Sequence, residues 1–171
     1  MKMSVKFILV LLCISSLLAS CDFIRDIFPN VKSQLTFKAS HSHQTFLSDT
    51  ILFSGKDIQW INGSTGEIHF TDSTTINKIK EYHWIKVYLG ADSLFKATVT
   101  VPTMSAIVND LVIDLNMTNG HFYFEDGYPS YIDNPGNNNI RLQNKNKRAA
   151  AWTRFTDELK KEGKYVIPQV K

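Results

Sequence analysis

Histidines and carboxylates are the side chains of this sequence that could carry out acid–base or metal chemistry. His41 and His43 are two residues apart, so on a strand both imidazoles would face one side and could reach one metal ion. No nearby carboxylate or cysteine offers further ligands, and the flanking serines favour an exposed polar loop. His69, His83 and His121 each stand alone in the sequence and are interpreted as strand-surface or interface residues. The sequence therefore predicts no metal site and no cofactor.

The acidic residues lack the spacing of a catalytic pair. Glu125 and Asp126 are adjacent, so on a strand they would point to opposite faces, which is poor geometry for a general acid and base. Asp110 and Asp114 would share a face, but four residues of strand separate them by roughly 13 Å. The sequence also lacks a P-loop, a GxGxxG motif and a nucleophile elbow. We therefore expect a protein that is not an enzyme, with a hydrolase as the alternative.

Aromatic residues offer a binding surface instead of a catalytic one. Exposed rings stack on sugars or on a partner protein, and the candidates are Trp84, Tyr88, Tyr123, Tyr128 and Tyr131. Tyr128 and Tyr131 are the first choice as ligand-binding residues because they lie in a predicted loop, and Tyr123 and Trp84 follow. The alternative is that most of these rings complete the core or pack beneath that loop.

The N-terminus indicates export. Lys2 and Lys6 flank the start of an apolar run over residues 7–18, which is about 12 residues long and too short to span a bilayer. The run ends in Leu18-Ala19-Ser20-Cys21, which resembles the bacterial lipobox, in which the cysteine is acylated on its thiol and becomes the first mature residue. Because two or three acyl chains hold a protein firmly on a membrane, the resemblance implies stable anchoring through Cys21.

The residues after Cys21 leave the final membrane open. Asp22 resembles the signal that retains enterobacterial lipoproteins in the inner membrane, and the denser acidic cluster that resembles a surface-export signal in Bacteroidota is missing. We expect anchoring to the outer membrane, on its periplasmic or its surface face, with the inner membrane as the alternative.

Cysteine usage and charge exclude further classes. Cys13 lies in the signal and Cys21 carries lipid, so the mature chain keeps no thiol for a disulfide, a zinc site or a nucleophile. Of the 19 basic residues, Lys2 and Lys6 are removed with the signal, which leaves 17 against 16 acidic residues. A nearly neutral chain without a basic run is not typical of a nucleic-acid-binding protein.

Strand patterns fill most of the mature chain. Alternation or composition predicts strands at 34–38, 84–89 and 95–101, with 45–53 as a further extended candidate. Two hairpins are predicted, over residues 53–70 with Gly63 and Gly66 at positive-φ positions of the turn, and over residues 111–125 with Asn119-Gly120 at the turn.

Two helices and a long loop complete the pattern. A short helix is expected over residues 73–82, capped by Thr74 or Thr75, and residues 126–139 are predicted to be a loop. Asn146 to Glu162 is predicted as a helix whose apolar stripe is Trp152, Phe155 and Leu159, with an ion pair between Asp157 and Lys161 and with Gly163 at the C-terminal cap.

These elements predict an α+β fold, an antiparallel β-sheet of hairpins and a meander covered by one C-terminal α-helix. A β-sandwich with a peripheral helix is the alternative. The expected organisation is a signal peptide over residues 1–20, the lipidated cysteine and a tether over residues 21–33, and a single globular domain over residues 34–171.

The chain resembles the small lipoproteins of Bacteroidota. The resemblance rests on Leu18 to Cys21 and on the stretches SGKDIQWINGSTGEIHF, NDLVIDLNMTNGHFYFEDGYP and AAAWTRFTDELKKEGKY. Many of these proteins have no assigned activity, so the resemblance implies location and class and no particular chemistry. We expect a lipid-anchored cell-envelope protein with a non-catalytic binding or accessory role, whose partner is a glycan or an envelope protein. The alternatives are a glycan-binding surface lipoprotein that uses the loop aromatics, and a protease-inhibitor-like or hydrolytic envelope protein.

Overall fold

Nine strands form one sheet in the computed structural model, which describes residues 33–40 and 50–168. The strands are β1 (Leu35–Ser40), β2 (Thr50–Ser54), β3 (Ile58–Asn62), β4 (Glu67–Phe70), β5 (Trp84–Leu89), β6 (Asp92–Thr100), β7 (Val112–Leu115), β8 (Phe122–Glu125) and β9 (Tyr165–Val166). The helices are the 3-10 turn η1 (Gly55–Asp57), α3 (Ser73–Ile79) and α4 (Pro135–Lys161). The signal, lipidation, tether and His41–His43 interpretations lie outside the described residues.

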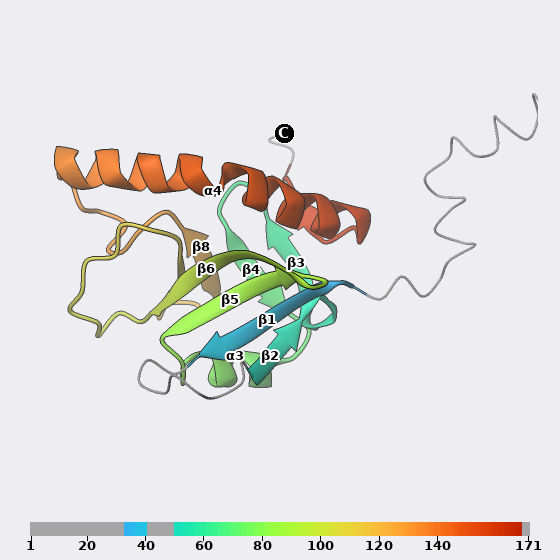
Figure 1. Ribbon diagram of the computed structural model, residues 1–171. Helices are drawn as coiled ribbons and strands as arrows, with labels where there is room; N and C mark the ends of the chain where they lie inside the picture. Colours follow the sequence, from blue (N-terminus) through green and yellow to red (C-terminus); the bar gives the residue numbers. More distant parts are fainter. Residues whose placement is uncertain (1–32, 41–49, 169–171) are drawn as a thin grey trace, which may run out of the picture. The chain divides into compact units, whose positions relative to one another are not determined.

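The sheet is curled into a half-barrel, and α4 lies across one of its faces (Figure 1). The strand order is β2-β1-β5-β6-β7-β8-β4-β3-β9, and neighbours are antiparallel except in the β6–β7 and β3–β9 pairs. The predicted α+β class with a helix-covered sheet is confirmed. The alternative β-sandwich is wrong, because the nine described strands all belong to one sheet.

The core lies between the sheet and the second half of α4. Phe155 and Leu159 of the helix are fully buried in one cluster with the inward-facing residues of the strands, as their predicted stripe requires. Phe155 meets Phe95 and Phe124 edge-on, with ring centroids 5.4 and 5.7 Å apart. Each such buried ring contributes about 1.5–3 kcal/mol through removal of its apolar surface from water, so the helix is part of the fold.

Both predicted hairpins are present. Residues 58–70 form β3 and β4, and Gly66 takes a φ of 77° in the turn between them. β7 and β8 pair antiparallel around Asn119-Gly120, where Gly120 has a φ of 72°. Gly66 and Gly120 stand where the chain needs the left-handed conformation, as the turn chemistry predicted. The same expectation for Gly63 is wrong, because Gly63 does not have a positive φ.

Helix α4 begins at Pro135, earlier than the predicted Asn146. The expectation of a loop over residues 126–139 is therefore wrong for residues 135–139, which belong to the helix. Asn134 caps the helix, because its Oδ1 accepts from the backbone N–H groups of Gly136 and Asn137, at 3.0 and 3.4 Å. A proline at the first helical position fits there because its missing N–H would have no partner in the helix.

At the C-terminal end of α4, the predicted glycine cap is present but the predicted ion pair is not. Asp157 pairs with Lys160 at 3.0 Å, and not with Lys161 as predicted, because i,i+3 neighbours are also adjacent on a helix. Gly163 follows α4 with a φ of 68°, as predicted for its cap.

The short helix α3 is present, but neither predicted threonine caps it. Asp72 does, since its carboxylate accepts from the backbone N–H of Thr74 at 2.9 Å. No helix in residues 33–40 and 50–168 is both long enough and apolar enough to cross a membrane.

Candidate functional site

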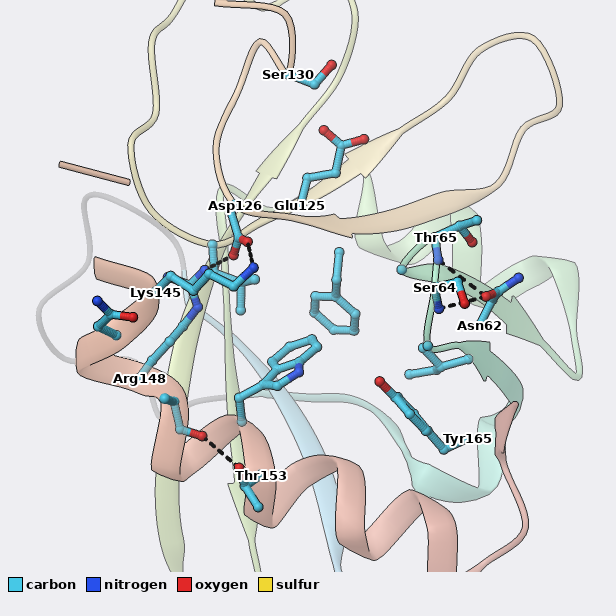
Figure 2. A pocket seen from close by; sticks show the side chains of 18 residues that line it. Asn62, Ser64, Thr65, Glu125, Asp126, Ser130, Lys145, Arg148, Thr153 and Tyr165 are labelled. Atoms are coloured by element: carbon cyan, nitrogen blue, oxygen red, sulfur yellow. Dashed lines mark hydrogen bonds and ion pairs between the residues drawn. The ribbon is translucent and has the colours of Figure 1, made fainter. Parts of the chain in front are cut away.

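A pocket of about 650 Å³ lies between α4 and the end of the sheet (Figure 2). Four segments line most of it: the β3–β4 turn, the end of β8, the face of α4 between Lys145 and Thr153, and Tyr165 of β9. A second hollow of about 280 Å³ shares Glu125, Asp126, Ser130 and Lys145 with it. Sheet pairing and helix docking thus bring together residues that are far apart in the sequence.

Aromatic rings supply the apolar part of the pocket. Trp152 is half-buried and meets Phe124 edge-on, with centroids 5.3 Å apart and an interplanar angle of 82°. Tyr165 forms the opposite side, and Figure 2 shows its hydroxyl directed into the pocket. Gly63 makes room for this ring, since a Cβ at residue 63 would lie 2.6 Å from Cζ of Tyr165. The result is an apolar surface with a hydroxyl beside it.

The β3–β4 turn supplies neutral polar groups. Asn62 holds the turn, because its Oδ1 accepts from the backbone N–H groups of Ser64 and Thr65, at 2.9 and 3.2 Å. Ser64 and Thr65 are exposed at the rim, on the side of the pocket opposite Lys145 and Arg148 (Figure 2). The turn therefore presents the hydroxyl groups of Ser64 and Thr65 on a backbone that the Asn62 side chain holds in place.

Paired charges form the other side. The Arg148 side chain, only 10% exposed, donates from Nη1 to Asp110 Oδ1 at 2.7 Å and from Nη2 to Asp126 Oδ1. Lys145 Nζ lies 2.7 Å from the second carboxylate oxygen of Asp126. Both oxygens of Asp126 are therefore engaged by cations. Because two basic and two acidic side chains line the pocket, its formal charge is balanced.

Glu125 is the other acidic residue of the pocket. Burial raises the pKa of its carboxyl above the ordinary value, Asp114 and Asp126 add to this, and Arg141 opposes it. In Figure 2 its carboxylate points away from the cluster of Asp126, Lys145 and Arg148. A carboxyl in this environment takes up a proton more readily and can then donate a hydrogen bond.

The four aromatic residues predicted to bind a ligand lie outside the pocket lining. Tyr128 is half-buried and donates its hydroxyl to the Val101 carbonyl at 3.2 Å, whereas Tyr131 is 83% exposed. Tyr123 and Trp84 lie on β8 and β5, three strands apart and hence separated by roughly 14 Å. The structure therefore does not gather these rings into one surface.

The carboxylates Asp110 and Asp114 have separate partners. Asp114 accepts from the Thr100 hydroxyl at 2.6 Å, while Asp110 accepts from Arg148. Neither residue lines the pocket.

Two histidines that stand alone in the sequence are neighbours in space. The rings of His69 and His121 have centroids 4.9 Å apart, and Glu67 lies beside them. His83 is exposed and is not a member of this cluster. The interpretation as a strand-surface residue is confirmed for His69, which lies on β4, whereas His121 immediately precedes β8. The view that each is isolated is wrong.

Sequence reasoning did not identify most of the pocket residues as a site, among them Lys145, Arg148, Trp152 and Tyr165. No motif joins them, and Lys145 lies before the predicted helix start at Asn146, so a shared side of α4 follows only from the helix as the structure has it. Comparison with models of protein families, with curated proteins and with solved structures finds no match. The residues of the chain itself therefore have to support any functional proposal.

Proposed function

We propose that this is a lipid-anchored protein of the bacterial cell envelope, held in the outer membrane through Cys21, whose folded unit binds a carbohydrate without chemical conversion. The lipobox-like Leu18–Cys21 supports the anchor, and the pocket beside α4 supports the binding role. The observation that carries the ligand class is a charge-balanced pocket that combines aromatic rings with neutral hydroxyl groups.

A sugar ring suits this combination. Its C–H faces are apolar and pack on aromatic rings such as Trp152 and Tyr165, while its hydroxyl groups both donate and accept hydrogen bonds. Ser64, Thr65 and the Tyr165 hydroxyl offer partners of the same kind. A pocket of about 650 Å³ falls within the range of roughly 300–1,000 Å³ that encloses small-molecule ligands.

The charges favour a neutral ligand over an anionic one. Arg148 and Lys145, which would attract a phosphate or a carboxylate, already hold Asp126 on both of its oxygens. An anion would have to compete with this carboxylate. The same pairing favours binding over hydrolysis, because two-carboxylate catalysis needs a second acidic group that is available beside Glu125.

Isothermal titration calorimetry of the unit Ser33–Lys171 with mono- and disaccharides tests the binding proposal. Tyr165→Phe removes one hydroxyl and keeps the ring, so the loss of a hydrogen bond of about 0.5–1.5 kcal/mol should weaken a detected affinity roughly twofold to tenfold. Tyr131→Ala is the matched control, because it removes an exposed ring outside the pocket. An affinity that Tyr131→Ala lowers and Tyr165→Phe leaves unchanged would place the binding on the loop and contradict the pocket.

Metabolic labelling with an alkyne fatty acid tests the anchor separately. The wild-type chain should take up the label, and Cys21→Ala should not, because the thiol is the site of acylation. Equal labelling of the two proteins would contradict lipidation at Cys21 and leave the binding proposal unaffected.

A further inference from the structure

The cluster of Glu67, His69 and His121 lies on the outer face of the sheet, opposite the core. Glu67 and His69 are two residues apart on β4, so both project from the same face, while Ile68 between them is buried. β4 pairs antiparallel with β8, and Ile68 lies opposite Phe122. The next position in this register sets His69 opposite His121, so adjacent strands bring all three side chains together.

The potential ligand atoms are close. One nitrogen or oxygen atom from each of Glu67, His69 and His121 lies within 4.8 Å of the other two. Nδ1 of His121 is 2.5 Å from Oε1 of Glu67, and these two side chains are 33% and 20% exposed. The cluster is thus partly shielded and still open to an ion from solution.

The ring of His69 is oriented by two residues of β3. Trp60 stacks on it, with centroids 4.5 Å apart and an interplanar angle of 15°. Its Nδ1 lies 3.2 Å from Oε1 of Gln59. Because an amide oxygen only accepts, this contact requires a proton on Nδ1 and leaves the lone pair of Nε2 free in the neutral ring. An orienting hydrogen bond of this kind is typical of histidines that bind metals.

We propose that Glu67, His69 and His121 bind one Zn²⁺ ion. Two imidazoles and one carboxylate form a donor set that zinc prefers, whereas Mg²⁺ and Ca²⁺ favour oxygen ligands alone. Three protein ligands leave a fourth position for water. This site is separate from the carbohydrate pocket, whose lining contains none of the three residues.

Coordination requires a modest contraction of the cluster. Zinc bonds of about 2.0–2.2 Å place neighbouring ligand atoms of a tetrahedral site roughly 3.3 Å apart. The present spread of up to 4.8 Å must shorten, and the 2.5 Å contact between His121 and Glu67 must open as the ion takes the place of their hydrogen bond. Side-chain rotations are enough for this, because the side chains are partly exposed and the strands fix only their backbones.

Calorimetric titration of the full-length chain in detergent, stripped with EDTA and then given ZnCl₂, tests the proposal. One Zn²⁺ per chain should bind, and MgCl₂ at the same concentration should give no signal. His69→Gln and His121→Gln should each weaken the zinc affinity at least about tenfold, the smallest effect expected even for the loss of an orienting partner. His83→Gln is the matched control, since it removes an exposed histidine outside the cluster and should change nothing.

A positioning role for Gln59 has its own pair of variants. Gln59→Leu removes the acceptor for Nδ1–H of His69 and should weaken zinc binding roughly tenfold to a hundredfold, while Gln59→Glu keeps an acceptor and should preserve it. A purely structural role would not separate the two variants in this way.

NMR of the wild-type chain provides a readout that needs no variant. Zn²⁺ should shift the imidazole resonances of His69 and His121 and leave those of His83 in place. The proposal is overturned if these resonances stay unchanged, if His69→Gln and His121→Gln bind zinc like the wild type, or if affinity is lost in the double variant His41→Gln, His43→Gln instead.

Discussion

Replacing Phe155 with alanine tests whether α4 is part of the core. Phe155 is fully buried, and its ring lies 5.3–6.2 Å by centroid distance from four other rings, namely Phe37, Phe95, Phe124 and Trp152. Three of those rings stand on strands of the sheet, which hydrogen bonds hold in place. The cavity left by the substitution therefore cannot close easily.

The expected cost follows from this rigidity. Buried Phe→Ala substitutions cost about 3–5 kcal/mol, more where the site cannot collapse, so we expect about 4 kcal/mol for Phe155→Ala. That is a large share of a typical unfolding free energy of about 5–15 kcal/mol. It corresponds to a fall in Tm of about 8–16 °C for a domain of this size. Trp152→Ala should cost less, because Trp152 is only half-buried.

Urea denaturation followed by far-ultraviolet circular dichroism measures these differences. Arg154→Ala is the matched control one residue away, because Arg154 and its partner Asp92 are 51% and 65% exposed and such pairs contribute at most about 1 kcal/mol. Equal midpoints for the wild type and Phe155→Ala would refute the reasoning and show that the helix stands apart from the core.

Three further substitutions test the β3–β4 turn, the pocket and the half-buried carboxyl of Glu125 one at a time. Gly66→Ala should destabilise the protein by at least about 1–2 kcal/mol in a denaturation experiment, because Gly66 has a φ of 77° and a Cβ there would lie 2.3 Å from the Phe124 carbonyl oxygen. Gly63→Ala should leave the unfolding midpoint nearly unchanged, because the added Cβ meets only the far end of the Tyr165 side chain, and should displace that ring, which near-ultraviolet circular dichroism would detect. Glu125 has a raised pKa, so the native state binds its proton more tightly than the unfolded chain does. The stability of the wild type relative to Glu125→Gln should therefore be highest below pH 4.5 and fall as the pH rises through the folded-state pKa, and denaturation across a pH series would contradict this if the difference stayed constant.

Local patterns in the sequence predicted the elements well. Alternating residues predicted most of β6 (Asp92–Thr100), composition predicted β5 (Trp84–Leu89), and glycines at the turns predicted both hairpins. The helical stripe predicted the burial of Phe155 and Leu159. These features depend on neighbours within a few residues, which is the range over which backbone propensity and amphipathic spacing act.

The start of α4 was missed for a physical reason. Proline, glycine and a run of asparagines are typical of loops, and they drew the loop prediction as far as residue 139. Asn134 followed by Pro135 is also a cap followed by a favoured first helical residue. The same residues thus fit a loop and a helix start, and the tertiary contacts of α4 decide between them.

The two candidate sites depend on long-range pairing, which no local pattern contains. Each hairpin was predictable by itself. The pairing of β4 with β8, which brings His69 beside His121, connects the two hairpins, although β5 and β6 lie between them in the sequence. The pocket likewise requires the parallel pairing of β9 with β3, which places Tyr165 opposite Ile61. Residue types alone therefore suggested loop tyrosines, and the structure placed other rings around a pocket.

NMR mapping on the ¹⁵N-labelled unit Ser33–Lys171 tests the central claim, that the pocket beside α4 binds a carbohydrate, most directly. During titration with the mono- and disaccharide panel, the account predicts that a binding sugar shifts the indole N–H of Trp152 and the backbone amides of Ser64 and Thr65. Shifts confined to Tyr128 and Tyr131, or no shift with any sugar of the panel, would contradict it.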